Sequence, residues 1–147
     1  MTATRTLAFD GIKVGDEVTP MSIDVTATVV VAGAVATRDF MPVHHDRDYA
    51  ATQGSPNIFM NILSDTGFAT RFLTDWAGPE AMLRKMAIRL GVPAYAGSKL
   101  DYTGSVTATS VADGEGLVEI TFRAANDQGD HLSGTAVIGL PLREARS

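Results

Sequence analysis

The stretch PNIFMNILSDTGFATRFLTDWA, residues 56–77, is the one long segment of this chain with a helical hydrophobic period. Ser55-Pro56 is a favourable helix start, because proline is tolerated in the first turn, and Gly78-Pro79 is a firm stop. One stripe holds the apolar side chains Ile58, Ile62, Ala69, Phe72 and Trp76, joined by Phe59, Leu63 and Leu73. The other side holds mostly polar residues, namely Asn57, Asn61, Ser64, Asp65, Arg71 and Asp75. The stretch therefore predicts a helix over residues 56–77 with a broad apolar face.

After this helix the hydrophobic period changes to two, which is typical of strands with one buried face. Apolar and polar side chains alternate over residues 85–92, 100–109, 118–124 and 131–140. The connections 113–116 and 126–130 are rich in Gly, Asn and Asp, which supply the positive φ angles of hairpin turns. The second half of the chain therefore predicts an antiparallel meander.

The residues before the long helix predict shorter elements. Residues 12–25 indicate an extended entry with a turn at Gly15-Asp16. Thr28 is predicted to cap a short helix through residues 29–36 that ends near Arg38. Pro42 lacks an N–H group, so the stretch from Asp39 to His44 is predicted to be a loop.

These elements together predict an α+β fold in one domain that spans residues 1–147, with residues 1–10 as a flexible N-terminal tail. A helix with so broad an apolar face can bury it only by lying across a curved sheet. A long central helix wrapped by a curved antiparallel sheet is the hot-dog architecture. No internal repeat or linker divides the chain.

Composition excludes several classes of protein. The chain has 147 residues, 45% of them hydrophobic and 20% charged, which is typical of a folded globular domain. Its net charge of −5 argues against a nucleic-acid partner, since such proteins usually carry a basic surface. It has no cysteine, no signal-like N-terminus and no apolar run long enough to span a bilayer. We expect a cytoplasmic protein without a membrane partner.

The stretch from Arg38 to Ala50 carries the residues suited to catalysis. It places the carboxylate of Asp39 and the imidazole of His44 five residues apart around Pro42. A rigid loop of this kind can direct both side chains at one water molecule. Hydration of an enoyl thioester requires a base, an acid and donors for the thioester oxygen, and Asp and His can share the first two roles.

The same stretch resembles a known motif. The pattern Asp39-x-x-Pro42-Val43-His44-x-Asp46-x-x-Tyr49-Ala50 is similar to the hydratase-2 motif of MaoC-like enoyl-CoA hydratases. In that family the Asp and the His are the catalytic pair, so the resemblance implies these roles for Asp39 and His44. The family commonly has Gly and Asn where this chain has Arg38 and Met41.

The resemblance extends over most of residues 12–140 to one branch of the family, the catalytic small subunit of actinobacterial steroid side-chain enoyl-CoA hydratases. It rests on residues 37–49, 58–63, 74–79 and 89–93. It implies that the substrate is an acyl-CoA of the steroid side-chain enoyl-CoA type, with CoA as part of the substrate and no separate cofactor. It also implies a second hot-dog protomer, either a different MaoC-like chain that lacks the catalytic pair or a second copy of this chain.

In the wider family a glycine N–H at the helix start binds the thioester oxygen, and the aligned residues here are Met60 and Asn61. Amides at a helix N-terminus lack intrahelical partners and carry a partial positive charge, so the Asn61 N–H is the predicted donor. Whether the Asn61 side chain also donates is left open. Met60, Ile62 and Met41 complete the predicted substrate-binding residues.

Two alternative functions use the same fold. A hot-dog thioesterase usually places an acid on the long helix, and Asp65 occupies such a position. A non-catalytic acyl-CoA-binding subunit would lack the Asp/His pair, which this chain retains.

Asp46 is expected to cap the turn through Tyr49. No metal site is expected, because the adjacent His44 and His45 cannot easily face one ion and no third ligand follows at a recognisable spacing.

Overall fold

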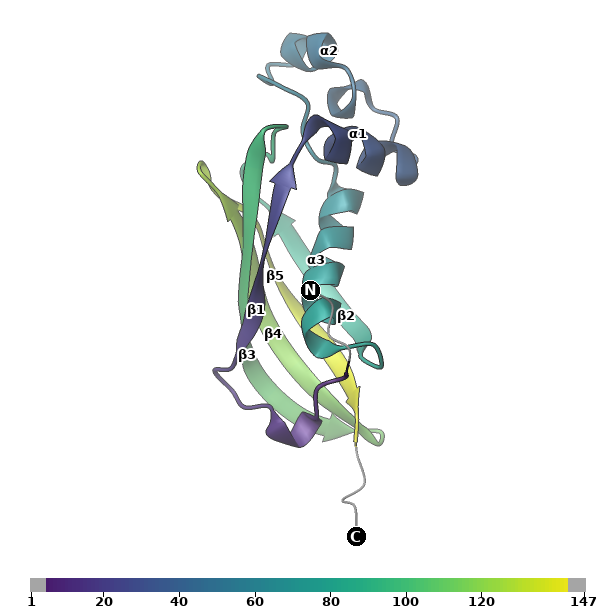
Figure 1. The fold of residues 1–147 in the computed structure, drawn as a ribbon, viewed down its shortest axis with the longest axis vertical. Coiled ribbons are helices and arrows are strands. Elements are labelled where there is room, and N and C mark those ends of the chain that lie inside the picture. The colour runs from purple at the N-terminus through teal and green to yellow at the C-terminus, as the bar shows by residue number, and fades with distance from the viewer. Residues whose placement is uncertain (1–4, 143–147) are drawn as a thin grey trace.

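The computed structural model describes residues 5–142 and consists of one antiparallel sheet, one long helix and several short helices (Figure 1). The strands are β1 (Glu17–Val25), β2 (Met82–Leu90), β3 (Ser98–Ala112), β4 (Glu115–Asn126) and β5 (Gly129–Pro141). The helices are α1 (Ala27–Ala36), α2 (Arg47–Thr52) and α3 (Ile62–Ala77), with 3-10 turns η1 (Phe9–Gly11) and η2 (Pro42–His44). Helices α1 and α2 lie at one end of the molecule, beyond the N-terminal end of α3.

The sheet order is β1-β3-β4-β5-β2, and every pairing is antiparallel. The β3–β4 hairpin turns at Asp113 (φ 51°) and Gly114 (φ 75°), which confirms the predicted turn chemistry. The predicted meander is wrong for β2, which pairs with β5 rather than with β3. The seven residues 91–97 carry the chain from one side of the sheet to the other, which a tight hairpin could not do.

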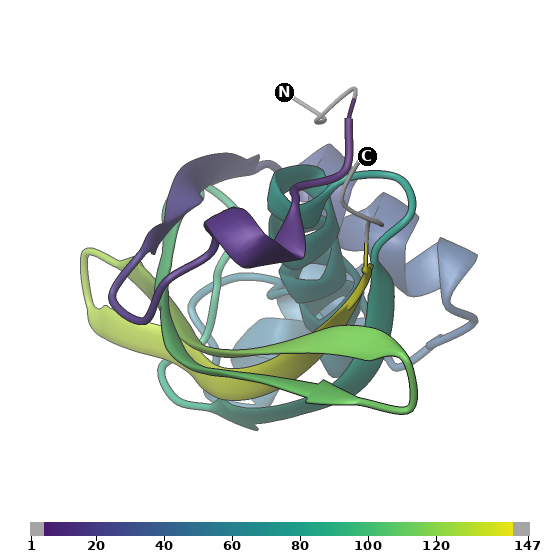
Figure 2. The ribbon, with the colours of Figure 1, turned by 90° about the horizontal axis from the view of Figure 1, so that it is seen from below.

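The sheet curves around α3, as the view along the long axis shows (Figure 2). Alternate residues of β4 are buried, among them Val118, Ile120 and Phe122, as the period of two predicted. Phe72 of α3 is 1% exposed and packs with its ring centroid 5.6 Å from that of Tyr102 on β3. This is the predicted hot-dog layout, with the apolar face of the helix buried on the concave face of the sheet.

The predicted start of the long helix at residue 56 is wrong, because α3 begins at Ile62. Residues 58–60 are extended and pair with the connection between β2 and β3: the Met60 N–H donates to the Ala94 carbonyl, and the Ala96 N–H donates to the Ile58 carbonyl. Asn61 is the N-cap, and its side-chain oxygen accepts from the Ser64 N–H at 3.2 Å. Backbone pairing over a long sequence separation therefore replaces the start of the predicted helix, residues 56–61.

The predicted faces of the helix are also wrong at its first turn. Ser64 and Asp65 are buried, whereas Ile62 and Leu63 are each 51% exposed. Asp65 can face inward because it has a buried partner, His131 of β5. Polar residues are therefore not a reliable guide to the exposed face here.

Two smaller predictions also differ from the structure. The short helix α1 is capped by Thr26, whose hydroxyl accepts from the Val29 N–H at 3.1 Å, and not by Thr28. Of the predicted tail, residues 1–4 lie outside the described residues. The Leu7 N–H donates to the Ala77 carbonyl, and Phe9 packs against the core. No helix between residues 5 and 142 is long and apolar enough to cross a bilayer.

Candidate active site

Asp39 is placed by the way helix α1 ends. The Arg38 N–H donates to the Val35 carbonyl and the Asp39 N–H donates to the Ala34 carbonyl, which is the hydrogen-bond pattern of a Schellman motif. That motif requires a left-handed conformation at the residue that follows the C-cap. The C-cap of α1 is Thr37, and the next residue, Arg38, has φ 59°. The family's usual glycine at this position has a physical reason, since glycine adopts this conformation without steric cost. The end of the helix therefore sets the direction of Asp39.

The Asp39 carboxylate is surrounded by hydrogen-bond donors. Its Oδ2 accepts from Asn61 Nδ2 at 3.1 Å, and its Oδ1 accepts from the Met41 N–H at 3.3 Å. The Asn61 amide is the main cause that lowers the pKa of the Asp39 carboxyl; the Met41 N–H and the His44 ring act in the same direction, whereas burial opposes them. The carboxylate is thus held in its ionised form.

His44 follows on the 3-10 turn η2 and is held by the segment before α3. Its Nδ1 lies 2.7 Å from the Phe59 carbonyl oxygen, and a carbonyl can only accept, so Nδ1 carries a hydrogen. In the neutral ring, Nε2 therefore has the lone pair, and it lies 3.4 Å from Asp39 Oδ2. The His44 side chain is 10% exposed and that of Asp39 28%, so small ligands can reach the pair.

The Asn61 side chain connects the two parts of the site. Its Nδ2 donates to Thr37 Oγ1 at 2.9 Å as well as to Asp39, so both amide hydrogens are engaged within the protein. This side chain therefore orients Asp39 and has no hydrogen left for a thioester oxygen. The Asn61 backbone N–H, in contrast, has no acceptor among the described residues. Asn61 is 2% exposed, and this N–H lies at the N-terminus of the sixteen-residue helix α3, where the dipole favours a developing negative charge.

The other predicted substrate-binding residues divide into two groups. Met60 is 3% exposed and its N–H donates to Ala94, so it belongs to the core and its amide is engaged. Met41 is 47% exposed and Ile62 51%. Large apolar residues near Asp39 and Asn61 in the chain are also exposed, namely Val35, Phe40 and Leu63. We call these five exposed residues, all within four positions of Asp39 or Asn61 in the chain, the apolar rim.

Neighbouring polar residues have structural roles. Asp46 is the N-cap of α2 and accepts from the Tyr49 N–H at 2.9 Å, which confirms its predicted capping role. His45 Nε2 lies 3.2 Å from the Phe40 carbonyl oxygen. The two adjacent imidazoles are therefore bonded to different backbone carbonyls.

Asp65 does not reach this site. It is fully buried and its Oδ1 lies 2.8 Å from His131 Nε2, inside the core. The acid required for the thioesterase alternative is therefore shielded from substrate. The sequence did not indicate two further site residues, Thr37 and Phe59. The Thr37 hydroxyl accepts from the Asn61 side chain, and the Phe59 backbone carbonyl accepts from His44.

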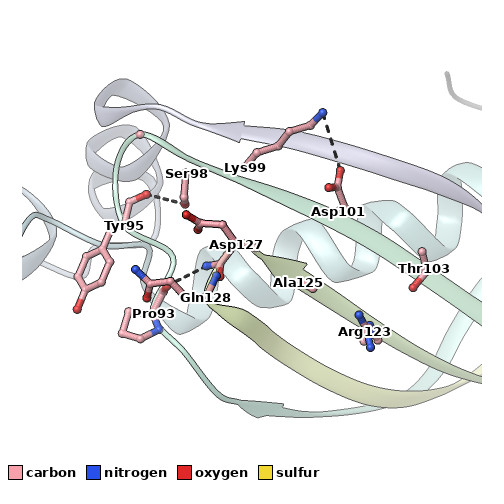
Figure 3. Close-up of a pocket in the computed structure, with 12 residues that line it drawn as sticks. Pro93, Tyr95, Ser98, Lys99, Asp101, Thr103, Arg123, Ala125, Asp127 and Gln128 are labelled. Carbon is pink, nitrogen blue, oxygen red and sulfur yellow. Dashed lines mark hydrogen bonds and ion pairs between the residues drawn. The ribbon is translucent and has the colours of Figure 1, made fainter.

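A cavity of about 760 Å³ lies elsewhere, on the outer face of β3 and β4 (Figure 3). Lys99, Asp101 and Arg123 project into it from the side of the sheet opposite to α3. Its charges are partly paired, with Lys99 Nζ 4.0 Å from Asp101 and Arg123 3.4 Å from Asp130. Tyr95 lines this cavity and packs edge-on against Phe59, but the cavity does not contain the Asp39–His44 pair.

Comparison with known proteins places the chain in a family. No family model matches it. The beta subunit of 3-oxo-4,17-pregnadiene-20-carboxyl-CoA hydratase from Mycobacterium tuberculosis is 47% identical over 118 residues, which cover 80% of this chain and 87% of the relative. The crystal structure of the ChsH1–ChsH2 complex from the same organism matches with 44% identity and a TM-score of 0.81, over 87% of this chain and 98% of that one.

A more distant structure supports the fold alone. The R-hydratase PhaJ1 from Pseudomonas aeruginosa has a TM-score of 0.82 at 21% identity, over 98% of this chain and 94% of that chain. The close relative, the shared fold and the hydratase-2 pattern around Asp39 agree with one another. The chain belongs to the MaoC-like hot-dog enoyl-CoA hydratases.

Proposed function

We propose that Asp39 and His44 are the catalytic residues with which this chain adds water across the 2,3 double bond of an enoyl-CoA thioester. The observation that carries this proposal is the 3.4 Å approach of His44 Nε2 to Asp39 Oδ2, with each group held by its own hydrogen bond. An acceptor nitrogen and an ionised carboxylate at this separation form a binding site for one water molecule.

The proposed reaction follows from these groups. The bound water attacks C3, one of its O–H bonds breaks, and its proton passes to the Asp39–His44 pair. The pair delivers a proton to C2, so that a C3–O bond and a C2–H bond form and the double bond is lost. Because the two groups interact, the protons belong to the pair rather than to either residue.

Negative charge develops on the thioester oxygen as C3 is attacked, and this oxygen needs a hydrogen-bond donor. The Asn61 N–H is the donor we assign, since it has no acceptor among the described residues and lies at the start of α3. Met60 is not suited to this role, because its N–H already donates to Ala94.

The acyl group we propose is a steroid side-chain enoyl group, as in the substrate that names the M. tuberculosis relative. The apolar rim supports this class, since a large fused-ring hydrocarbon needs apolar contacts next to the polar pair. The exposed rim residues Phe40 and Leu63 would be unfavourable in water without such a ligand or a covering protein.

We also propose that the chain works beside a second MaoC-like chain, as in the ChsH1–ChsH2 complex. Strands β1 and β2 are the edges of the sheet and have unpaired backbone groups available for another protomer. A second copy of this chain is the alternative partner when it is expressed alone.

The test is hydration of a steroid side-chain enoyl-CoA by purified variants, followed by the absorbance of the conjugated thioester. Asp39→Asn and His44→Ala should each lower kcat by about 10² to 10⁴. Asp46→Asn is the matched control, since it makes the same change in the same loop and Asn also caps helices, so it should retain activity. Near-parental rates in Asp39→Asn would contradict the assignment, and release of free thiol would indicate thioester hydrolysis instead.

A further inference from the structure

A second Asp/His pair, Asp65 and His131, is buried in the core and takes no part in the proposed chemistry. Asp65 is 0% and His131 2% exposed, and Asp65 Oδ1 lies 2.8 Å from His131 Nε2. The other ring nitrogen of His131, Nδ1, lies 2.6 Å from the Val92 carbonyl oxygen. Since a carbonyl only accepts, Nδ1 donates to Val92, and His131 connects helix α3, strand β5 and the residues that follow β2.

The groups around Asp65 and His131 favour the hydrogen bond between these two side chains. Burial alone would lower the pKa of the His131 ring, but the hydrogen bond and charge of Asp65, together with the Val92 carbonyl, raise it overall. Tyr102 is the other titratable group that faces Asp65, and burial followed by the Asp65 charge raises the pKa of its hydroxyl. Asp65 Oδ2 and the Tyr102 hydroxyl make no hydrogen bond within the described part of the chain. Asp65 is thus connected through His131.

A buried ionisable pair of this kind usually stabilises a fold no more than apolar side chains of similar volume would. What it adds is direction, because two hydrogen bonds at fixed angles determine where three elements lie. The segment it directs is the connection 91–97, whose Gly91 N–H donates to the His131 carbonyl at 2.7 Å. The pair therefore acts as a clamp on this connection.

The clamped connection holds the backbone that holds His44. Its Ala94 carbonyl accepts from the Met60 N–H at 3.0 Å, and its Tyr95 forms an isolated β-bridge with Phe59. The Phe59 carbonyl is the acceptor for His44 Nδ1 at 2.7 Å. The Phe59 ring also packs against both His44 (4.9 Å between centroids) and Tyr95 (6.1 Å). One contiguous series of contacts thus runs from His131 to His44.

We propose that His131 is a positioning residue for His44: by bonding the Val92 carbonyl it fixes the connection 91–97, which fixes the Phe59 carbonyl that orients the His44 ring. This proposal rests on the catalytic role proposed for His44. When the Val92 bond is lost, the Phe59 carbonyl moves and the ring of His44 loses its set tautomer and direction. A displacement of about 1 Å in a catalytic group can lower the rate by about 10².

Two substitutions at one position separate the clamp from general stability. In His131→Asn the short amide can take the place of Nδ1 and donate to Val92, while the bond to Asp65 is lost. In His131→Gln the longer amide reaches Asp65 but not Val92. We expect His131→Gln to lower kcat by about tenfold or more with little change in KM, whereas His131→Asn keeps most of kcat.

Nitrogen-15 NMR of the His44 ring gives a readout that does not depend on the reaction. It should report a hydrogen on Nδ1 in the parent chain and in His131→Asn, and a mixed tautomer in His131→Gln. Leu140→Ala is the control for destabilisation, since it opens the core at the opposite end of β5 and leaves the connection 91–97 untouched. An altered His44 spectrum in an enzyme that proves insensitive to His44→Ala would support the clamp and reject the proposed function.

The proposal is overturned if His131→Gln and His131→Asn have the same kcat per folded molecule, or if the His44 spectrum is the same in both. It is also overturned if Leu140→Ala lowers kcat as much as His131→Gln does. If neither His131 variant folds, Asn126→Ala decides, because Asn126 Nδ2 donates to the Pro93 carbonyl at 3.1 Å and so tethers the same connection from a partly exposed position. Lower kcat with a changed His44 spectrum then supports the clamp, and parental values for both reject it.

Discussion

Replacing Asn61 by Asp tests how the ionisation of Asp39 is controlled. Asp at position 61 can still cap α3, because a carboxylate accepts from the Ser64 N–H as the amide oxygen does. The change replaces Nδ2, which donates to Asp39 Oδ2 at 3.1 Å, with a second carboxylate oxygen. The helix start is therefore preserved, while a donor to Asp39 becomes a like charge.

The magnitude follows from the separation. Two unit charges about 4 Å apart repel by about 1 kcal/mol in water and about 4 kcal/mol at an effective dielectric constant of 20. The Asp39 side chain is 28% exposed but Asn61 is 2% exposed, so the repulsion lies between these two limits. One pKa unit corresponds to about 1.4 kcal/mol, so we expect the pKa of the Asp39 carboxyl to rise by about one unit or more.

The assay is the pH dependence of kcat/KM, whose acid limb reports the essential base of the free enzyme. The limb should move to higher pH in Asn61→Asp. In Asn61→Ser, which keeps a capping hydroxyl but lacks the amide donor, it should move less. An acid limb that is the same in Asn61→Asp as in the parent chain refutes the reasoning.

The free energy of unfolding should also depend on whether Asp39 is ionised. The lowered pKa of Asp39 means that its ionised form stabilises the fold above its ordinary pKa, and this contribution is lost as the pH falls through the folded-state value. Replacing the donor by a like charge reverses the effect at neutral pH. The free energy of unfolding of Asn61→Asp should therefore differ most from that of the parent at neutral pH, and the difference should shrink on acidification.

Two further predictions concern the helix end and the assembly. Arg38→Gly should raise the free energy of unfolding by up to about 1 kcal/mol, because Arg38 has φ 59° and glycine adopts this left-handed conformation without strain. Arg38→Ala should not raise it, and urea unfolding measures the free energy of both variants. Light scattering during size-exclusion chromatography should give a mass above that of one chain, since β1 and β2 leave two unpaired edges. A fully active monomer would contradict the proposal that the chain works beside a second protomer.

Most of the fold could be predicted because its signals are local. Alternation over β3, β4 and β5 and the positive-φ turn at Asp113-Gly114 each depend on a few neighbouring residues. The wrong start of α3 has the opposite origin. Residues 58–60 fit a helical period as well as a strand, and what selects the strand is pairing with residues 94–96, more than thirty positions away. The hydrophobic pattern of residues 58–60 holds no information about their pairing with residues 94–96.

The same distinction applies to polar residues in the core. A rule that places Asp on the exposed face is correct for most helices, since burying a charge without a partner is costly. Asp65 is an exception because His131, 66 residues away, supplies the partner. Neither residue stands out alone, and only the fold shows that the alternative acid for a thioesterase is enclosed.

The sequence alone indicates the two groups that we propose to react, but not the contacts that orient them. Asp39 and His44 are five residues apart, so one loop brings both to the same place, and a local motif is enough to find them. What each group can do depends on distant contacts: Asn61, 22 residues away, favours the ionised carboxylate, and Phe59, 15 residues away, selects the tautomer of the imidazole. Substitutions at Asp39 or His44 should therefore lower kcat itself, by about 10² to 10⁴. Substitutions at the distant contacts should instead move the pH profile or the His44 spectrum, and this difference separates the residues that react from those that orient them.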